Sequence, residues 1–456
     1  MKKYRFFSLL LVFLVIKGSA ANAQGRNKAP NVIVIFVDDL GYGDLGCYGH
    51  PTMETPFIDQ MAAEGMRFTQ FYVGANVCTP SRAALLTGRL PVRYGLTGGT
   101  GVFFPNSDGG LPQSEITIAK ALKTKAYQTG LIGKWHLGHL PQYLPAKHGF
   151  DYYFGLPYSN DMLPERLRQP AFPPLPLYKD SKIIETNPDQ RTLTGRYTDE
   201  ALGFIKKNKD RPFFLYYANN FPHVPLYVSD KFKGKSKRGL YGDVMLELDW
   251  SVGQILKTLK ELKLDENTLV FFCSDNGPWL TKKENGGSAG LLFEGKDSAY
   301  EGGMRVPAIA WWPGTIKPNQ TSTALATTMD VLPTILNLAK VELPKDRVFD
   351  GTNLMPLLTG QKEKVRDVVY YYYQSKLFAI RKGSWKAHFA TKPSYTRVAP
   401  VFHNPPLLYN LDQDPSEKFE IGKQHPEVIE ELKKEYEKHV AGVVPVPSQL
   451  EATIND

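Results

Sequence analysis

The feature that most restricts the fold of this chain is a pair of apolar runs that each end in acidic and amide side chains. The first run, NVIVIFVDDL, reaches Asp38 and Asp39, and the second, NTLVFFCSDNG, reaches Asp275 and Asn276. Continuous apolar runs are typical of central strands in a parallel sheet that helices cover on both faces. Because ligands of such sheets gather at the carboxyl ends of the strands, we expect both polar pairs to lie at that edge.

Other segments predict an α/β protein with a second, smaller unit. TIAKALKTKAYQTG and YGDVMLELDWSVGQILKTLKELK have the apolar spacing of amphipathic helices, and RPFFLYYAN is typical of a strand. Such alternation favours a large, mostly parallel sheet flanked by helices. After about residue 360, VVYYYYQSKLFAIRKGSWKAHFA indicates antiparallel strands and HPEVIEELKKEYEKHV a final helix. We expect one domain over residues 24–360 and a small α+β subdomain over residues 361–456.

The first residues predict an export signal. Basic residues precede an apolar stretch too short to span a membrane comfortably, and Ala21–Ala23 matches an A-x-A cleavage site. We expect residues 1–23 to be a cleaved signal peptide of a periplasmic or secreted protein without a stable membrane anchor. Their removal lowers the formal net charge from +9 to +5. This mild positive charge is explained equally well by an anionic substrate and by lysines scattered over the surface. We expect no nucleic-acid partner. The sequence leaves the oligomeric state open.

The two polar pairs together predict a metal site. Three carboxylates and an amide oxygen at neighbouring strand ends form a set of hard oxygen ligands suited to Ca²⁺ or Mg²⁺. Either pair alone would more often cap a helix or turn. The stretch GYGDLG (Gly41–Gly46) has the form of a dinucleotide-binding motif, but Asp38 and Asp39 would repel a pyrophosphate and no helix start follows.

One of only three cysteines stands at a predicted helix start, in NVCTPSRAALLTGR. Thr79 is a suitable N-cap and Pro80 a suitable first helical residue. Because a helix N-terminus favours negative charge, Cys78 is either a thiolate with a lowered pKa or simply a residue beside a helix. Cys47 and Cys273 are too few for a disulfide framework; they either pair or stay as separate buried thiols.

CTPSRAALLTGR resembles the signature of type I sulfatases, C-x-P-S-R followed by L-L-T-G-R, in which the cysteine is oxidised to formylglycine. DDLGYGDLGCYG, GKWHLG, PHVP, SDNG and GKDSAYEGGMRVPAIAWWPG resemble the remaining blocks of that family in the same order. The resemblance runs from about residue 31 to LYNLDQDPSE, and is greatest to the N-acetylgalactosamine-6-sulfatase branch, with arylsulfatase A next. It implies an alkaline-phosphatase-like α/β sandwich and hydrolysis of sulfate monoesters.

The resemblance also implies a nucleophile and a metal. Residue 78, converted to 3-oxoalanine (formylglycine) by a maturation enzyme, would present two geminal hydroxyls as a hydrate. One hydroxyl attacks sulfur, and deprotonation of the other reforms the aldehyde and expels sulfate. Arg82, one helical turn beyond Cys78, would hold this hydrate. Ca²⁺, or Mg²⁺, would be bound by Asp38, Asp39, Asp275, Asn276 and residue 78 itself.

Five further residues would contact the sulfate or drive the chemistry. Lys134 and His136, two apart in GKWH, would share one face of an extended segment. Lys134 would bind sulfate, and His136 would contact the hydroxyl whose deprotonation expels sulfate. His223 and Lys296 would contact the sulfate and the leaving oxygen, one of them as general acid, and Ser159 would line the same pocket. Taken singly, such histidines and lysines are more often structural or solvated.

The implied substrate is a sulfated carbohydrate, with 6-O-sulfated galactose or N-acetylgalactosamine of a glycosaminoglycan or algal polysaccharide as the first candidate. The alternatives are an arylsulfatase of other specificity and a phosphatase or phosphonate hydrolase on the same scaffold, and the single oxygen cage with the maturation motif favours sulfate. A glycan-binding protein without activity would lack some of the implied residues, and none is missing.

Overall fold

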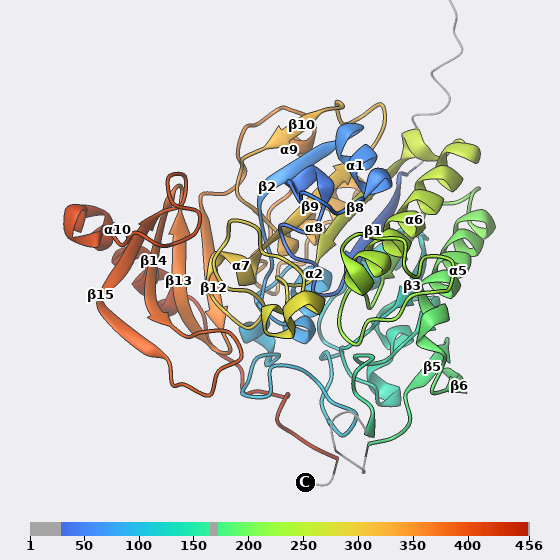
Figure 1. Ribbon diagram of the computed structural model, residues 1–456, viewed down its shortest axis with the longest axis horizontal. Coiled ribbons are helices and arrows are strands. Elements are labelled where there is room, and N and C mark those ends of the chain that lie inside the picture. The colour runs from blue at the N-terminus through green and yellow to red at the C-terminus, as the bar shows by residue number, and fades with distance from the viewer. Residues whose placement is uncertain (1–28, 165–171, 455–456) are drawn as a thin grey trace, which may run out of the picture.

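The structure is a computed structural model that describes residues 29–164 and 172–454. Figure 1 shows a large sheet with helices on both faces and, beside it, a smaller sheet formed by the C-terminal part of the chain. The predicted signal peptide, residues 1–23, lies outside the described residues. Within the described ranges, no helix has both the length and the apolar character needed to cross a membrane.

The large sheet has 11 strands within the described residues, in the order β10-β2-β9-β8-β1-β7-β3-β4-β5-β6, with β11 paired to β2. The strands are β1 (Asn31–Val37), β2 (Met66–Tyr72), β3 (Gln128–Gly133), β4 (Tyr152–Gly155), β5 (Pro176–Lys179), β6 (Lys182–Thr186), β7 (Phe213–Ala218), β8 (Thr268–Ser274), β9 (Arg305–Trp311), β10 (Gln320–Ser322) and β11 (Ala326–Thr327). From β8 through β1, β7 and β3 to β4 the neighbours are parallel, whereas β9, β5 and β6 run antiparallel to theirs. The predicted mostly parallel sheet is confirmed.

The two apolar runs form the adjacent strands β1 and β8. They are paired in register up to their last residues, so Asp38 and Asp275 leave the sheet at the same edge. This is the juxtaposition that the two runs predicted. Cys273, near the end of β8, is fully buried and is not bonded to Cys47; both are free thiols.

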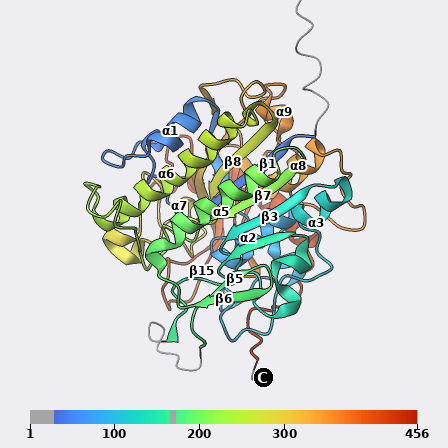
Figure 2. The ribbon, with the colours of Figure 1, turned by 90° about the vertical axis from the view of Figure 1, so that its right-hand side faces the viewer.

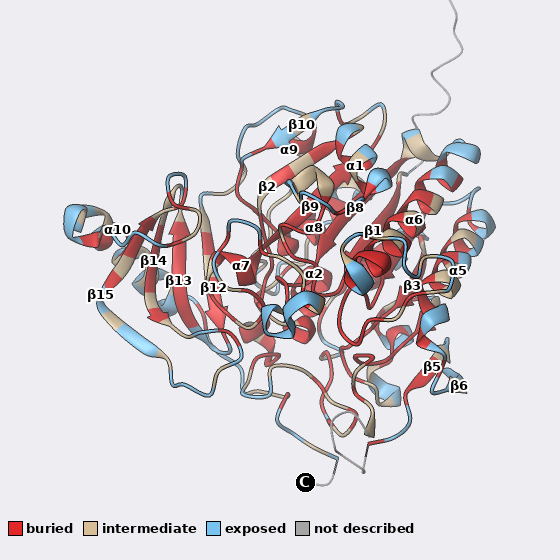
Figure 3. Ribbon diagram, in the orientation of Figure 1, coloured by how far each residue is buried: buried red, intermediate tan, exposed pale blue. Residues whose placement is uncertain are grey.

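Alternate side chains of β1 enter two separate apolar cores. The even-numbered positions from Val32 to Phe36 pack with α2, α3 and α8, and the odd-numbered positions from Ile33 to Val37 pack with α1, α5 and α6. Figure 2 shows α5 and α6 lying across the strands, and Figure 3 shows buried strands beneath helices whose outer faces are exposed. The helices are α1 (Pro56–Ala63), α2 (Cys78–Thr87), α3 (Ile118–Leu122), α5 (Leu193–Lys207), α6 (Gly239–Glu261), α7 (Glu301–Met304), α8 (Val331–Leu338) and α9 (Met355–Leu358).

The smaller unit, here called the C-terminal subdomain, consists of four antiparallel strands and one helix. Its strands are β12 (Val368–Tyr373), β13 (Lys376–Lys382), β14 (Trp385–Thr391) and β15 (Val401–Asn410), in that order, and its helix is α10 (Pro426–Ala441). Lys382 pairs with Trp385 across a turn in which Gly383 has a φ of 58°. The predicted turn, antiparallel sheet and final helix are confirmed.

A buried ionic cluster joins the C-terminal subdomain to the large sheet. Glu301, in α7, accepts hydrogen bonds from the hydroxyls of Tyr72 and Tyr371, each at 2.7 Å. Tyr72 belongs to β2 and Tyr371 to β12, so the same carboxylate bonds to both sheets. Arg381, in β13, donates to the Tyr72 hydroxyl. Unpaired charges are costly to bury, so this set of partners fixes one docking arrangement of the two units.

Candidate active site

Helix α2 begins two residues earlier than the sequence predicted. Cys78, rather than Pro80, is its first residue, and Val77 takes the N-cap position with an extended backbone. Thr79 does not cap the helix. Its hydroxyl instead donates to the His136 carbonyl (2.9 Å) and accepts from the Phe103 N–H (3.2 Å). The predicted cap residue therefore connects α2 to two neighbouring loops, a role that only the tertiary structure reveals.

The thiol of Cys78 is buried against a carboxylate. Its Sγ lies 3.4 Å from Asp38 Oδ1, and the residue is 2% exposed. Burial, and after it the charge of Asp38, raises the thiol pKa well above its ordinary value, although Lys134 and Lys296 act in the opposite direction. The hypothesis of a thiolate with a lowered pKa is therefore wrong: the unmodified Cys78 is a neutral thiol.

Three buried carboxylates face three buried cations around Cys78. Arg82 Nη2 lies 2.7 Å from Asp275 Oδ2 and 3.4 Å from Asp38 Oδ1. Lys134 Nζ lies 2.5 Å from Asp38 Oδ2, and Lys296 Nζ lies 2.7 Å from Asp39 Oδ1. Three acidic side chains thus face three basic ones in a buried site, so the charge of any ion that enters changes the interactions of all six.

The two histidines of the predicted site are neutral. Burial, and after it the charge of Lys296, lowers the pKa of His223 to about 3. Burial, and then Lys134, holds the pKa of His136 well below its ordinary value. Each imidazole therefore carries one N–H and one free nitrogen lone pair at neutral pH, which suits hydrogen bonding and proton transfer.

Several buried side chains around Cys78 present ligand atoms that fit a divalent cation. Asp38, Asp39, Cys78 and His223 each offer one ligand atom, and these atoms all lie within 4.8 Å of one another. Asn276 Nδ2 donates to Asp39 Oδ1 (2.7 Å), while Asn276 Oδ1 is buried without a hydrogen-bond partner among the described residues. A carbonyl oxygen left unpaired beside carboxylates is what a hard cation would coordinate. The sequence had not placed His223 in this group.

Asp275 lies at the margin of that group. Its Oδ1 accepts the N–H of Asp39 (3.1 Å), and its Oδ2 is held by Arg82. Burial, and after it the charge of Asp38, raises the pKa of Asp275 to about 7. A divalent cation would favour its charged form, so the carboxylate fits the predicted ligand set although Arg82 already engages one oxygen.

Lys134 and His136 reach the site in a different way from the one predicted. Strand β3 ends at Gly133, and His136 has a φ of 58°, so the segment is not extended and the argument from a shared face was wrong. Lys134 Nζ also lies 3.3 Å from Ser159 Oγ. His136 Nε2 lies 2.9 Å from the Phe103 carbonyl, and Nδ1 is buried with no partner in residues 29–164 and 172–454.

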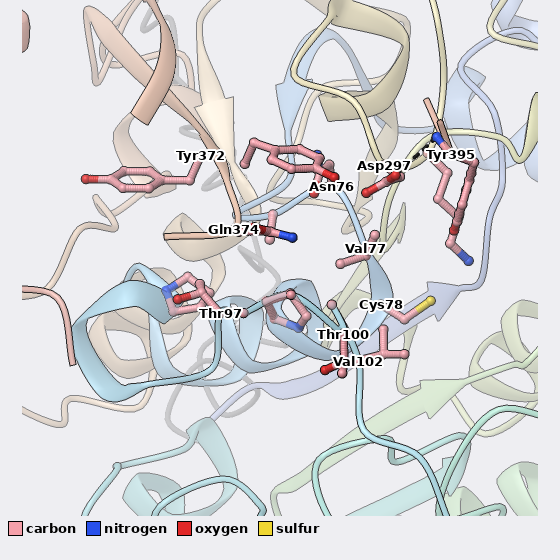
Figure 4. A pocket seen from close by; sticks show the side chains of 18 of the residues that line it. Asn76, Val77, Cys78, Thr97, Thr100, Val102, Asp297, Tyr372, Gln374 and Tyr395 are labelled. Atoms are coloured by element: carbon pink, nitrogen blue, oxygen red, sulfur yellow. Dashed lines mark hydrogen bonds between the residues drawn. The ribbon is translucent and has the colours of Figure 1, made fainter. Parts of the chain in front are cut away.

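A cavity of about 470 Å³ opens onto Cys78 (Figure 4). From the predicted site, its wall includes Cys78, His136, Ser159, His223 and Lys296. The remaining predicted residues, namely Asp38, Asp39, Arg82, Lys134, Asp275 and Asn276, are at most 3% exposed. The wall also contains residues that the sequence did not single out, among them Asn76, Trp279, Asp297 and Tyr395. Asn76 and Asp297 lie within the quoted stretches NVCTPSRAALLTGR and GKDSAYEGGMRVPAIAWWPG, and Trp279 stands two residues after SDNG, so proximity to these blocks is a local signal for three of the four.

Residues 97–104 form one side of the cavity, and residues 446–454 lie behind them. The Gln449 N–H donates to the Gly95 carbonyl (2.9 Å), and the Asp108 N–H donates to the Ala452 carbonyl (3.0 Å). Thr100 Oγ1 donates to the Leu450 carbonyl (2.8 Å). We call residues 446–454 the strap, because they bond to the 95–108 loop at both of its ends and near its centre.

The glycines of GYGDLG serve close packing. A Cβ at Gly41 would lie 2.1 Å from the Ser288 carbonyl oxygen, and one at Gly43 would lie 2.6 Å from the Gly290 nitrogen. The loop around residue 288 therefore presses directly on this turn. This contact gives the glycine spacing a structural cause and agrees with the rejection of a dinucleotide site.

Comparison with known proteins identifies the family. The sulfatase family matches residues 30–341, and the C-terminal region of aryl-sulfatase matches residues 364–455. Arylsulfatase A of Homo sapiens is 43% identical over 443 residues, covering 89% of this chain and 87% of that protein. N-acetylgalactosamine-6-sulfatase of Canis lupus familiaris is 39% identical over 485 residues, covering 96% and 91%. The PsFucS1 sulfatase from Pseudoalteromonas sp. superposes with a TM-score of 0.83 at 32% identity, covering 91% of this chain and 90% of that one. The chain therefore belongs to the sulfatase family, has its alkaline-phosphatase-like sandwich, and is a sulfuric ester hydrolase.

Proposed function

We propose that this sulfatase removes sulfate from a sulfated saccharide, with residue 78 acting as formylglycine. The observation that carries the proposal is the neutral Cys78 thiol, buried 3.4 Å from Asp38 Oδ1. A neutral thiol is a weak nucleophile, because the thiolate is the reactive form. An aldehyde hydrate at the same position would offer hydroxyl groups to the same carboxylate and to the cations beside it.

Asp38, Asp39, Asp275, Asn276 and residue 78 would hold Ca²⁺, with Mg²⁺ as the alternative. When bound, the divalent cation would supply positive charge near the sulfuryl oxygens, and the formylglycine hydrate would supply the attacking hydroxyl. The unpaired Asn276 Oδ1 supports this ligand set. The hard oxygen donors suit either ion, so equilibrium dialysis with each metal would distinguish them.

The cations of the chain would bind and orient the sulfate. Lys134 and Lys296 are each bonded to one of the proposed metal-binding carboxylates. An incoming sulfate would therefore find two ammonium groups already positioned, with Ser159 Oγ beside Lys134. Arg82 would hold residue 78 through Asp38 and would fix Asp275.

The neutral histidines suit the two proton transfers. His136 Nε2 is held by the Phe103 carbonyl, so Nδ1 is free to accept a proton from a hydroxyl of residue 78. His223 Nε2 lies 3.6 Å from Asp39 Oδ2 and lines the cavity beside Lys296. Either His223 or Lys296 would protonate the departing alcohol. To distinguish them, the activities of His223→Ala and Lys296→Ala would be measured on substrates whose leaving groups differ in pKa.

The proposed substrate carries 6-O-sulfated galactose or N-acetylgalactosamine, as in a glycosaminoglycan or algal polysaccharide. The 39% identity to N-acetylgalactosamine-6-sulfatase supports this choice. We also propose that residues 1–23 direct export to the periplasm or outside the cell, that a formylglycine-generating enzyme modifies Cys78, and that residues 24–360 and 361–456 form the catalytic domain and the subdomain.

The test uses protein produced together with a formylglycine-generating enzyme. Sulfate release would be measured from defined 6-O-, 4-O- and 2-O-sulfated saccharides, from an aryl sulfate and from a phosphate monoester, and mass spectrometry would follow the Cys78 peptide. We expect release from the 6-O-sulfated galacto-configured sugar, in proportion to the modified fraction. Release only from the aryl sulfate or from other sugars would contradict the substrate, and full activity with an unmodified thiol would contradict the mechanism.

A further inference from the structure

The cavity that opens onto Cys78 is shared between the two units of the protein. Beyond the residues proposed for catalysis, its wall continues onto the C-terminal subdomain through Tyr372, Tyr373, Gln374, Lys392, Tyr395, Thr396 and Arg397. Figure 4 shows Tyr395 and Asp297 near the Cys78 end of the cavity and Tyr372 at the opposite side. The cavity is thus larger than a sulfate group requires, and its outer part has no role in the chemistry proposed above.

Two stacked aromatic rings form part of this outer wall. The rings of Trp279 and Tyr395 lie 4.8 Å apart between centroids, at an interplanar angle of 25°. Trp279 also lies 5.5 Å from the His223 ring, and the Lys296 ammonium lies 4.7 Å from its centroid. Tyr395 is 40% exposed, so part of the residue remains accessible while its ring stacks on Trp279. A flat apolar surface therefore stands directly beside the proposed sulfate-binding residues.

The segment that carries Tyr395 is bonded to the segment that carries Lys296. The Tyr395 N–H donates to Asp297 Oδ2 (3.1 Å), and Ser394 Oγ donates to the Lys296 carbonyl. Tyr395 has a φ of 49°, in the left-handed region that large side chains rarely adopt. Strain of this kind is kept only where surrounding contacts impose it, and it concentrates at functional positions. The two hydrogen bonds are those contacts, and they hold the ring in its place.

Two buried polar groups of the cavity wall lack partners among the described residues. Asn76 Nδ2 and Trp279 Nε1 are buried without a hydrogen bond in the part of the chain that the structure describes. Arg397 is exposed and forms no ion pair with any described residue. Buried polar groups are normally paired, and ligand hydroxyls would pair them.

We propose that Tyr395, supported by Trp279, forms a subsite for the pyranose ring of an oligosaccharide, and that Arg397 contacts an acidic group on the neighbouring sugar. The C–H face of a pyranose suits an open aromatic face, whereas its hydroxyls suit the unpaired amide and indole N–H groups. The subsite rests on the proposed function, because the sulfate of the same ligand would occupy the Cys78 end of the cavity. The protein is thereby assigned to acidic oligosaccharides rather than to isolated sulfated sugars.

The kinetic test compares full-length, formylglycine-containing variants on a sulfated monosaccharide and on two sulfated oligosaccharides, one with an acidic and one with a neutral neighbouring sugar. Tyr395→Ala should raise KM for both oligosaccharides about tenfold and change kcat less than about threefold, since one aromatic contact contributes about 1 kcal/mol or slightly more, and tenfold in affinity corresponds to about 1.4 kcal/mol. Tyr395→Phe should keep the wild-type KM. Arg397→Ala should raise KM only for the oligosaccharide with the acidic neighbour, and Arg191→Ala, an exposed arginine outside the cavity wall, is the matched control.

The proposal is overturned if Tyr395→Ala leaves KM for the oligosaccharides within about twofold, or if it lowers kcat equally for all three substrates, which would mean that Tyr395 only positions Lys296. A second measurement does not depend on turnover: calorimetric binding of the same oligosaccharides to Cys78→Ala protein with and without Tyr395→Ala. If the formylglycine-containing enzyme hydrolyses none of these esters while binding to the Cys78→Ala protein depends on Tyr395, the subsite is retained and the proposed function is rejected. Hydrolysis of these esters, together with oligosaccharide binding that does not depend on Tyr395, would retain the proposed function and reject the subsite.

Discussion

Lys386 and Glu301 form a fully buried ion pair between the two units of the protein, with 3.0 Å between Lys386 Nζ and Glu301 Oε1. Lys386 belongs to β14 of the C-terminal subdomain, whereas Glu301 lies in α7, a few residues after Lys296. The segment that bears Lys296 is therefore attached to the subdomain at several places, among them this pair and the Ser394 bond to the Lys296 carbonyl. Changes at the boundary should consequently affect both stability and the site.

Glu301→Gln should destabilise the protein by about 3 kcal/mol, because it removes the buried negative charge that faces Lys386, Arg381 and Arg305, and Glu417 then remains as the one carboxylate paired with Lys386 among the described residues. Urea unfolding would measure the loss. The matched control is Glu431→Gln: Glu431 pairs with Lys382 at 2.6 Å but is 58% exposed, so its loss should cost less than about 1 kcal/mol. Equal losses for the two variants would contradict the assignment of Glu301 to a buried cluster.

The same variant should change the response to acid. Burial alone would raise the pKa of Glu301, but Lys386, Arg381 and Arg305 outweigh it and hold the pKa well below the ordinary 4.5. The stabilisation from this carboxylate is therefore complete above about pH 4.5 and is lost as the pH falls toward the folded-state pKa. Glu301→Gln should show a smaller loss of stability than the wild type between pH 5 and pH 3.

Asp249 should have the opposite pH dependence. Its carboxylate, in α6, accepts the N–H groups of Phe57 (3.2 Å) and Ile58 (2.8 Å) at the start of α1. Burial raises the pKa of Asp249 to about 7. A raised folded-state pKa means that its stabilisation is complete below the unfolded value of 3.8 and is lost as the pH rises through about 7.

Asp249→Asn should therefore gain stability relative to the wild type as the pH rises from 4 to 8, by an amount on the order of 4 kcal/mol. Loss of the hydrogen-bond acceptor destabilises the variant by the same amount at every pH. The test is therefore the slope of the free energy of unfolding against pH and not its absolute value. Thermal unfolding at several pH values would measure it. Parallel profiles for the two proteins would show that Asp249 is ionised throughout.

Arg82→Lys should lower kcat by about 10² while leaving KM nearly unchanged. A lysine cannot reproduce the planar guanidinium that reaches both Asp275 and Asp38, so the carboxylates would lose their fixed spacing. Steady-state kinetics on fully modified protein would measure the change, with Arg89→Lys, at the end of the same helix region, as control. A large rise in KM with normal kcat would instead place Arg82 in substrate binding.

Deletion of residues 446–456 should lower kcat at least about tenfold, because the 95–108 loop would lose its support and Phe103 would no longer hold His136. A synthetic peptide of the deleted residues, added to the shortened protein, should restore part of the activity. Leu450→Ala, which removes a side chain that is 2% exposed, should have a smaller effect of the same kind. Unchanged kcat after the deletion would show that the loop keeps its conformation without the strap.

The sequence predicted those parts of the site that follow directly from local pattern. β1 and β8 were recognisable because strands buried on both faces have no polar positions, and their in-register pairing then places Asp38 beside Asp275. The positions of His136 and Tyr395 depend on left-handed backbone conformations that are imposed by distant contacts, including the bond from the His136 N–H to the Pro157 carbonyl (3.0 Å). Neither backbone conformation changes the spacing of apolar residues in the sequence, so the positions of these two side chains are known only from the folded structure.

The strap has a consequence for the order of events during synthesis. Residues 446–454 follow the loop around Phe103 and the segment with Cys78 in the chain, so they are synthesised after both. Every residue of α2 is buried in the finished protein, so the maturation enzyme proposed above would reach Cys78 more easily before the helix has packed. On the proposed function, the strap would complete its side of the cavity after Cys78 has been made, and a chain that still lacks the strap would leave Cys78 open to modification before the site is complete.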